Sequence, residues 1–321
     1  MIRRARAEDE PAVFDLLQAS LGWLADEHHA AFFDWKHRRN PFGVSPEWVA
    51  VDGDRIVGFR TFMRWQFDTR AGPRRAVRAV DTATSPTHRG RGVFSQLTRH
   101  ALEELHEEGV DFVFNTPNDQ SRPGYLKLGW QLVGRLPVSV RVRRPAALLR
   151  VARARVASEL WSLDTDAGDA AADALADTSA VAHLLASQPG PIGIRTHRTP
   201  EYLAWRYAGF QPLHYRAAVA PGGIERGVVF FRLRRRGPAT EAVICDALVP
   251  RAESRALNAL VRTAVAVSGA DHGVRLGAGG VGAGFLTLPR QGPRLTWRAV
   301  AESASAPLRS WTLTMGDIEL F

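Results

Sequence analysis

A segment near residue 80 constrains the fold more than any other part of the chain. It joins an apolar strand, a proline-marked turn, two glycines and the start of a helix, and reads AVDTATSPTHRGRGVFSQL over residues 79–97. Pro86 marks the turn, while Gly90 and Gly92 permit backbone conformations with positive φ. Several main-chain N–H groups and the positive end of the helix dipole would then face one spot. The segment therefore predicts a site for an oxygen-rich anion such as a diphosphate.

This glycine pattern differs from other well-known motifs. It lacks the Gly-Lys-Ser/Thr of a Walker loop and the three spaced glycines of a dinucleotide fingerprint. The chain also has no Gly-x-Ser-x-Gly elbow, so a serine hydrolase finds no support. Taken alone, the loop also fits an ordinary strand–turn–helix connection.

The first part of the chain alternates between strand and helix patterns. Apolar residues from Val13 to Leu21 recur at helical spacing, and Gly53-Asp54 between two apolar segments predicts a hairpin. The expected order is β-α-α-β-β-β-α-β-α-β. The strands are expected at 2–6, 47–52, 55–67, 74–84, 111–115 and 131–143, and the helices at 7–21, 26–38, 93–108 and within 122–130.

Size and composition indicate a globular protein of more than one domain. The chain has 321 residues, 45% of them apolar and 23% charged, which suits two domains with sizeable cores. No uncharged apolar stretch reaches the ~20 residues that span a bilayer, so no membrane partner is expected. The start MIRRARAEDEPAVF is acidic where a signal peptide is apolar, which predicts a cytoplasmic protein. The one cysteine, Cys245, excludes an internal disulfide.

The chain is strongly basic, with 42 Lys and Arg against 33 Asp and Glu, a net charge of +9. An anionic partner fits this balance, whether nucleic acid or a phosphorylated small molecule. The basic residues are nearly all arginine and are scattered along the sequence, from Arg3 to Arg275, instead of lying on one helix face. This scatter disfavours nucleic acid, and a GC-rich genome would produce the same arginine bias.

The second part of the chain repeats features of the first in the same order. Trp35-Lys36-His37 is matched by Trp205-Arg206-Tyr207, and the strand VDTATSP by ICDALVP, so that Asp246 corresponds to Asp81. No glycine-rich turn follows Pro250 in the second copy. Internal duplication explains these matches best, with the ligand site lost from the second copy. We expect three regions: residues 1–143, an alanine-rich helical linker at 144–190, and a degenerate copy at 191–321.

Two separated motifs resemble the GNAT superfamily of acyl-CoA-dependent N-acyltransferases. The pyrophosphate loop of that family, Gln/Arg-x-x-Gly-x-Gly/Ala, is similar to Arg89-Gly-Arg-Gly92-Val-Phe94, with Phe94 in place of a small residue. Asn115-Thr-Pro-Asn118 and Tyr125-Leu-Lys-Leu-Gly129-Trp130 follow at the expected distance. The tandem arrangement also resembles the mycobacterial "enhanced intracellular survival" aminoglycoside acetyltransferases, which pair an active unit with a degenerate one. The resemblance implies an α/β fold with mixed sheets in two tandem GNAT-like units, the second degenerate.

The resemblance also implies a site and a reaction. Acetyl-CoA or another acyl-CoA would be the cosubstrate, Tyr125 the general acid, and Asp81 the best candidate for the base. Two structural roles stay open as alternatives. Tyr125 would then pack the helix under the loop, and Asp81 would hold the strand bend or a loop. The residues implied in acyl-CoA binding are Thr82, Ala83, Thr84, Arg89, Gly90, Arg91, Gly92, Val93, Phe94 and Asn118.

The sequence thus predicts an N-acyltransferase that moves an acyl group, acetyl first, from CoA to the amine of a small molecule by direct attack on the thioester. A non-catalytic acyl-CoA-binding or regulatory module is the alternative, and a basic nucleic-acid-binding protein is a more distant one. No metal is expected, because His28, His29 and His88 have no third ligand at metal spacing.

Overall fold

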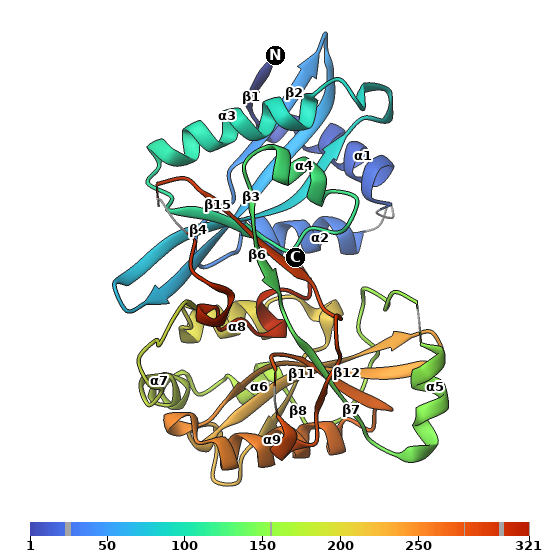
Figure 1. Ribbon diagram of the computed structural model, residues 1–321, viewed down its shortest axis with the longest axis vertical. Coiled ribbons are helices and arrows are strands. Elements are labelled where there is room, and N and C mark those ends of the chain that lie inside the picture. The colour runs from blue at the N-terminus through green and yellow to red at the C-terminus, as the bar shows by residue number, and fades with distance from the viewer. Residues whose placement is uncertain (23–26, 155, 279, 302–304, 321) are drawn as a thin grey trace. The chain divides into compact units, whose positions relative to one another are not determined.

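The computed structural model describes residues 1–22, 27–154, 156–278, 280–301 and 305–320. It contains two compact units (Figure 1). Unit 1 comprises Met1–Gly134 and Arg294–Trp311, and unit 2 comprises Arg135–Pro293 and Thr312–Phe321. Each unit is therefore built from two chain segments, whereas the sequence patterns suggested continuous regions.

Unit 1 is organised around a mixed sheet with the strand order β1-β2-β3-β4-β5-β15-β6. β4 and β5 pair in parallel, and the other recorded pairs of this sheet are antiparallel. The strands are β1 (Ile2–Arg4), β2 (Glu47–Asp52), β3 (Arg55–Thr69), β4 (Gly72–Thr84), β5 (Phe112–Asn115), β6 (Gln131–Arg135) and β15 (Arg294–Ala299). The helices are α1 (Glu10–Leu21), α2 (Glu27–His37), α3 (Val93–Glu107) and α4 (Arg122–Lys127).

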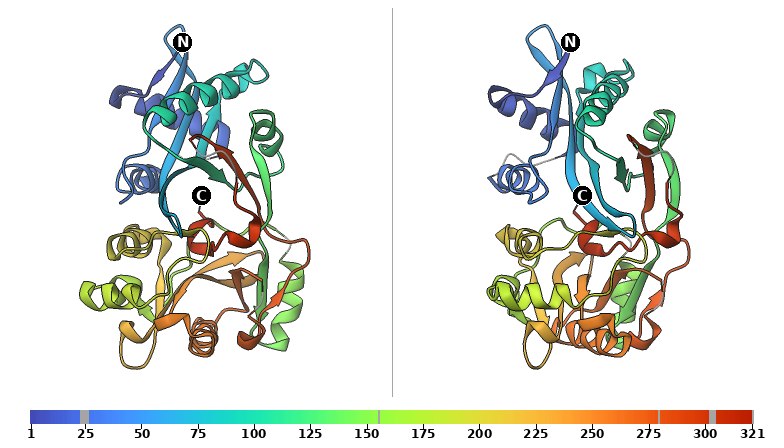
Figure 2. Two further views of the ribbon diagram at one scale, coloured as in Figure 1. Left: turned by 60° about the vertical axis from the view of Figure 1, so that its left-hand side comes forward. Right: turned by 90° about the vertical axis from the view of Figure 1, so that its left-hand side faces the viewer.

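Helices cover both faces of this sheet. Leu97, Ala101 and Leu105 recur at helical spacing on α3 and are fully buried against one face. Gly58 of β3 permits this close approach, because a Cβ there would lie 2.5 Å from Cγ1 of Val93. α1 and α2 pack on the opposite face, as the right-hand view of Figure 2 shows with both in blue and α3 in teal.

The expected strand over residues 131–143 is two strands in two different sheets. β6 ends at Arg135, and β7 (Val138–Val142) pairs with β13 in unit 2. Pro137 lies in the break and has no N–H to continue a ladder. The place beside β5 is taken by β15, which pairs through Thr296↔Asn115 and Trp297↔Phe114.

Unit 2 contains a second mixed sheet with the order β14-β7-β13-β12-β11-β10-β8, in which β12 and β13 are parallel. Its strands are β7, β8 (Asp169–Ala170), β10 (Arg216–Val219), β11 (Val228–Arg236), β12 (Ala239–Leu248), β13 (His272–Leu276) and β14 (Leu286–Thr287). The strand β9 (Arg195–Thr196) also falls within the residues of this unit. Its helices are α5 (Leu148–Arg153), α6 (Ala171–Ala174), α7 (Thr178–Ala186), α8 (Pro200–Ala208) and α9 (Ser254–Val267).

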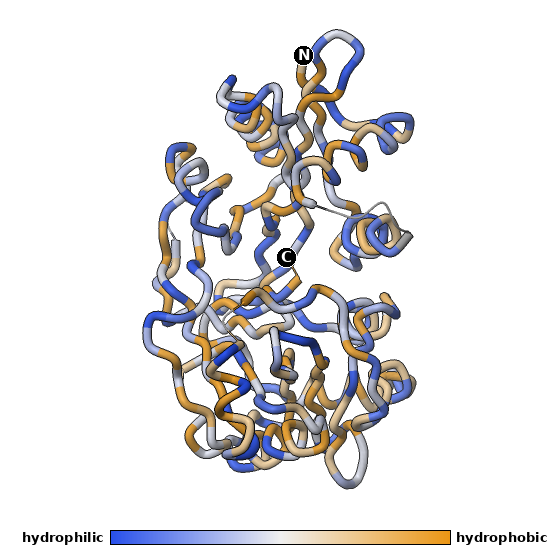
Figure 3. Tube along the Cα trace, turned by 90° about the vertical axis from the view of Figure 1, so that its right-hand side faces the viewer, coloured by the Kyte–Doolittle hydropathy of each residue, from blue (hydrophilic) through white to orange (hydrophobic). Residues whose placement is uncertain are grey.

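The core of unit 2 forms between α9 and its sheet. Val261, Ala264 and Val265 of α9 are buried with Phe231 of β11 and Ile244 of β12. Figure 3 shows hydrophobic residues, in orange, interleaved with hydrophilic ones, in blue, along the chain of both units. The expected α/β fold with two mixed sheets is confirmed.

Residues 144–190, expected to be a helical linker, contribute instead to unit 2. β8 pairs with β10 through Arg216↔Ala170, and Val181 and Leu184 of α7 are buried. The alanine-rich composition suggested a solvated linker because it offers few bulky apolar side chains. Small side chains can nevertheless fill the core at this place, since Ala171 of α6 is itself buried.

The pairing of β15 with β5 generates a prediction. The Trp297 side chain is 1% exposed and lies with its ring centroid 6.3 Å from that of Phe112, so Trp297→Ala removes a large part of the core that β15 contributes. We expect a loss of about 3–5 kcal/mol in the free energy of unfolding, measured by urea denaturation. The matched control Leu286→Ala, at a side chain 70% exposed, should lose about 0.5 kcal/mol or less. Equal losses would contradict a structural role for β15.

Candidate active site

A β-bulge in β4 organises the candidate site. Phe59 of β3 pairs with Ala83 and Thr61 pairs with Val80, so that Asp81 and Thr82 together face the single residue Arg60. Asp81 has φ +42°, in the left-handed region that non-glycine residues seldom adopt. Successive side chains of a strand point to opposite faces, and the extra residue shifts this alternation in β4 by one position relative to β3. Asp81 faces α2, while Thr82 faces α3 and α4.

The carboxylate of Asp81 is held by the last turn of α2. Nζ of Lys36 forms an ion pair with Oδ2 of Asp81, and Nε2 of His37 donates to the same oxygen at 2.8 Å. Oγ of Ser45 lies 2.9 Å from Nδ1 of His37, where it acts as donor when Nε2 carries the proton. Lys36 is 2% exposed and His37 0%, so this cluster is inside the protein. In the part of the chain that the structure describes, Oδ1 of Asp81 accepts no hydrogen bond.

Burial and neighbouring charge act in opposite directions on this cluster. Burial would raise the pKa of the Asp81 carboxyl, but the Lys36 ammonium and the hydrogen bond from His37 hold that pKa well below its usual range. Burial lowers the pKa of the His37 imidazole, against the opposing effect of Asp81. The cluster at neutral pH is therefore a lysine–carboxylate ion pair beside a neutral histidine.

On the other face of the bulge, the hydroxyl of Tyr125 meets a buried arginine. Tyr125 lies in α4 and is 5% exposed. Nη1 of Arg60 donates to Oη of Tyr125 at 3.0 Å and to Oγ1 of Thr82 at 2.7 Å. The Tyr125 ring also packs edge-to-face on Phe94 and contacts Trp130. Thr82 and Tyr125 are thus brought together by Arg60.

The glycine loop has the geometry expected for anion binding. Gly90 and Gly92 have φ +77° and +78°, and both are exposed, as are Arg89 and Arg91. Gly92 precedes the first helical residue, Val93, and no side chain caps the end of α3. The first main-chain bond of the helix comes from the N–H of Gln96, which leaves the earlier amides without helical partners. The loop therefore offers free N–H groups and two guanidinium groups at the positive end of a helix dipole.

β4 leaves its β5-facing edge open just before this loop. The two strands pair from Ala76↔Phe112 to Arg78↔Phe114, and within the described residues no pairing with β5 follows beyond that point. The main-chain groups of Thr82, Ala83 and Thr84 therefore lie on a stretch without a ladder partner on that side. An extended amide-containing ligand fits such an edge, because it can complete the missing hydrogen bonds.

Two residues of the predicted site have explicable local roles. Phe94, where the family pattern has a small residue, lies beside Gly124, and a Cβ at Gly124 would be 3.4 Å from Cε1 of Phe94. The missing side chain at Gly124 thus makes room for the ring. Oδ1 of Asn118 accepts from the N–H groups of Gln120 and Ser121 at 3.1 and 2.8 Å, so this oxygen orders the turn before α4.

Unit 2 contains an equivalent of the Asp81 cluster. Oη of Tyr207, at the end of α8, donates to Oδ2 of Asp246 at 2.5 Å, and Nη2 of Arg198 donates to Oδ1 at 2.7 Å. A Cβ on Gly316 would lie 2.2 Å from Oη of Tyr207, so the segment around Gly316 packs directly on this pair. Both carboxylate oxygens are therefore occupied by residues of the chain itself.

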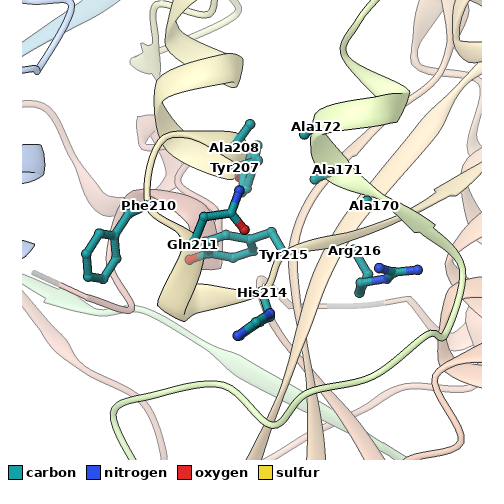
Figure 4. Close-up of a pocket in the computed structure, with 10 residues that line it drawn as sticks. All are labelled: Ala170, Ala171, Ala172, Tyr207, Ala208, Phe210, Gln211, His214, Tyr215 and Arg216. Carbon is teal, nitrogen blue, oxygen red and sulfur yellow. The ribbon is translucent and has the colours of Figure 1, made fainter. Parts of the chain in front are cut away.

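The loop before α9 differs from the glycine loop of unit 1. Arg251 and Ala252 have φ +53° and +52°, so side chains occupy left-handed positions where unit 1 has glycine. Glu253 stands at the N-cap of α9, and its negative charge opposes a phosphate. A pocket in this unit, shown in Figure 4 between Ala171, Tyr215 and neighbouring residues, has a volume of about 90 Å³. That is well below the roughly 300 Å³ at which ligand pockets begin. A second cavity of this unit, lined by Glu241, His272 and Val138 among others, has a volume of about 490 Å³ and exceeds that size.

Neither a metal-binding cluster nor a membrane-spanning helix occurs among the described residues. No group of three or more His, Cys, Asp or Glu side chains in these ranges is placed to hold a metal ion. None of the helices described here is long and apolar enough to cross a membrane.

Comparisons with known proteins agree with this geometry. Residues 1–133 match a family model described as an acetyltransferase (GNAT) domain. None of the curated proteins matches the chain. Unit 1 therefore carries a GNAT acetyltransferase domain, which confirms the resemblance seen in the sequence.

Solved structures share the fold over 94% of this chain. A conserved Enterococcus faecalis protein of unknown function, described as a probable N-acyltransferase, has a TM-score of 0.62 at 13% identity and is covered over 73% of its length. A GCN5-related N-acetyltransferase from Kribbella flavida has a TM-score of 0.61 at 18% identity, with 71% covered. Eis1 from Mycobacterium abscessus has a TM-score of 0.57 at 17% identity, with 74% covered. At these identities the likeness establishes the fold alone.

Sequence reasoning overlooked three side chains of the site. In the sequence, Lys36 and His37 were noted only because they match residues of the second copy. No local pattern indicated that they contact Asp81, because His37 and Asp81 are 44 positions apart in the chain. Arg60 lies in the apolar segment RIVGFRTF. An arginine in a strand expected to be buried is unusual, and this could have identified Arg60 as a residue of the site.

The depressed pKa of the Asp81 carboxyl generates a prediction about pH. The lowered folded-state pKa contributes stability that is present above the unfolded pKa of about 3.9 and is lost as pH falls below it. Breaking the buried pair by Asp81→Asn should therefore lower the free energy of unfolding by about 3 kcal/mol at pH 7. This difference from wild type should shrink as pH falls below about 4.

Urea denaturation at a series of pH values measures the difference. Asp54→Asn is the matched control, because Asp54 is exposed in the β2–β3 turn and should change stability by about 0.5 kcal/mol or less. A gap between wild type and Asp81→Asn that stays constant down to about pH 2.5 would contradict the ion pair.

Proposed function

We propose that the protein transfers an acyl group, acetyl first, from CoA to the amine of a small molecule. The observation that carries this proposal lies in unit 1, where the uncapped glycine loop at α3 and the hydroxyl of Tyr125 flank the open edge of β4. The GNAT domain match supports it.

The CoA half of the reaction follows from the loop and the strand edge. Main-chain N–H groups of residues 89–94 would bind the diphosphate, assisted by the exposed guanidinium groups of Arg89 and Arg91. Main-chain groups of Thr82, Ala83 and Thr84 would bind the pantetheine amides. An N–H directed at the thioester carbonyl would stabilise the oxyanion that forms during attack. The turn ordered by Asn118 would support α4 beside this ligand.

The transfer requires two proton movements. An acceptor amine with a pKa near 10 must lose a proton before its lone pair can attack the thioester carbon. The new C–N bond forms and the C–S bond breaks, so that sulfur leaves with the electron pair. Tyr125 would give its phenolic proton to this sulfur, as general acid.

Asp81 would act on the acceptor side. Its carboxylate remains ionised, and its Oδ1 is unoccupied by described residues, so it can receive an N–H of the acceptor ammonium. A carboxyl with so low a pKa is a weak base. We therefore propose that Asp81 orients the amine and passes its proton on to water, while Lys36 and His37 keep the bend in place.

We further propose that unit 2 is a degenerate copy that binds no CoA. The pair Tyr207–Asp246 corresponds to His37–Asp81, which supports a common origin. The loop before α9 carries side chains in place of glycine and an acidic N-cap residue. The segment around Gly316 covers the carboxylate that would face an acceptor.

A direct assay tests the activity. We expect purified protein to release CoA from acetyl-CoA in the presence of a suitable member of a panel of small amines, at a steady rate detected with a thiol reagent. Mass spectrometry of the product should show one acetyl group on nitrogen. Binding of CoA without release on any amine would favour the non-catalytic acyl-CoA-binding alternative. A salt-dependent gel shift without CoA binding would favour nucleic acid.

The glycine loop generates a prediction about CoA affinity. Gly92→Val places a branched side chain at φ +78°, beside the amides that would face the diphosphate, and should weaken CoA binding at least about tenfold. Calorimetric titration is the measurement, and the wild type should bind one CoA per chain. Gly269→Val is the matched control, because Gly269 has φ +68° and nothing within 4 Å of its Cβ position. Unchanged affinity in folded Gly92→Val would reject the loop as the CoA site.

A further inference from the structure

Arg60 carries a positive charge that the resting protein does not neutralise. Its side chain is 0% exposed. Nε and Nη2 have no hydrogen-bond partner, and Nη1 is shared between the neutral oxygens of Tyr125 and Thr82. Across the described ranges no carboxylate pairs with this guanidinium. A buried charge left without a counter-charge is costly in free energy.

Aromatic rings compensate for part of this cost. The Arg60 guanidinium lies 4.2 Å from the ring centroid of Phe62, 5.4 Å from that of Phe94 and 5.3 Å from that of Tyr125. Such cation–π contacts contribute about 2 kcal/mol when desolvated, less than a counter-ion would. The site is therefore suited to an anion that arises only during the reaction.

The direction of the hydrogen bond identifies where that anion arises. A guanidinium has five N–H donors and no acceptor, so Oη of Tyr125 accepts from Arg60. The phenolic proton of Tyr125 consequently points elsewhere and is available for transfer. Once it is given away, the negative charge on Oη lies 3.0 Å from Nη1 of Arg60.

Among the described residues, the other side chains that pack on Tyr125 carry no negative charge. α3 contributes the ring of Phe94, and Trp130 follows α4. Arg298 of β15 lies 5.9 Å from the Trp130 ring, so the further charge on this side is also positive. The neighbouring groups therefore favour a negative charge on Tyr125.

We propose that Arg60 is a positioning residue that stabilises the phenolate of Tyr125 at the moment the CoA sulfur departs. The proposal rests on the acyl transfer described above. In this step the C–S bond breaks, sulfur keeps the electron pair and takes the phenolic proton, and the phenolate is reprotonated by the second proton that the nitrogen loses as it becomes an amide, the first having gone to water before attack. No other reactant is needed. The charge of Arg60 is used in the transition state and not in binding acetyl-CoA.

A double-mutant cycle tests the coupling. Tyr125→Phe and Arg60→Met should each lower kcat on the order of 10²-fold, because each removes the assisted proton transfer. KM for acetyl-CoA should stay within about threefold of wild type in both variants. The double variant should have the kcat of Tyr125→Phe alone, because Arg60 acts through Tyr125. Multiplication of the two losses, or a loss confined to KM, would overturn the proposal.

Arg78→Met is the control for coupling. Arg78 is an arginine of β4 that is 1% exposed, and its Nη2 donates to Thr116, away from Tyr125. The effect of Tyr125→Phe should be as large in the Arg78→Met background as in wild type. If Arg60→Met does not fold under the assay conditions, Arg60→Lys is the second variant. Lysine keeps the positive charge, so Arg60→Lys should retain a larger share of the wild-type kcat than Arg60→Met, with both variants assayed at a lower temperature at which Arg60→Met folds.

A measurement without turnover separates this inference from the proposed function. The Cζ resonance of Tyr125 in ¹³C-tyrosine-labelled protein is identified by its loss in Tyr125→Phe. At neutral pH its chemical shift should change in Arg60→Met, because the hydroxyl loses the hydrogen bond that Arg60 donates, and should stay unchanged in Arg78→Met. An identical resonance with and without Arg60 overturns the inference, whereas a wild type that never releases CoA overturns the acyl transfer alone.

Discussion

The bend of β4 at Asp81 is the constraint on which the arrangement of unit 1 depends. A non-glycine residue at φ +42° is strained by about 1–3 kcal/mol and persists only where its surroundings hold it. Lys36 and His37 hold it by binding the carboxylate from α2. Thr82, the next residue, points to the opposite face, where its hydroxyl accepts from Arg60. The bulge thus carries one polar contact on each face of the sheet.

The two faces of this bulge differ in electrostatic character. On the α2 face, a carboxylate is kept ionised by a lysine, which suits recognition of a cationic amine. On the α4 face, a guanidinium without a carboxylate lies beside a phenol, which suits a developing negative charge. Amine attack on a thioester needs this pair of environments, because positive charge must leave the nucleophile while negative charge collects on sulfur.

The two units contain a similar interaction in different surroundings. In both, the last turn of a helix donates to an aspartate near the end of a central strand, through His37 to Asp81 and Tyr207 to Asp246. In unit 2 the second oxygen of Asp246 is occupied by Arg198, and the segment around Gly316 lies against the pair. Both oxygens of Asp246 thus have partners within unit 2, whereas Oδ1 of Asp81 accepts no hydrogen bond from the described residues.

Local patterns were sufficient for much of unit 1. The period of apolar residues placed α1, α3 and β3 to within a few residues, because amphipathic spacing follows from which face is buried. The strand–glycine–helix order of residues 79–97 also predicted the loop geometry, since Gly90 and Gly92 do adopt positive φ. The prediction of one strand over residues 131–143 was wrong. The alternation of apolar and polar residues continues across Pro137, but the strands that pair with this segment change there.

The sequence by itself determined most elements of unit 1, the glycine loop and the GNAT resemblance, because each depends on residues close together in the chain. Tertiary structure alone decided that β15 pairs with β5, that Lys36 and His37 bind Asp81, and that Arg60 donates to Tyr125. These contacts join residues at least 44 positions apart. No local pattern records them, because a charged side chain in a strand or helix has the same sequence signature whether its partner is water or a distant residue of the core.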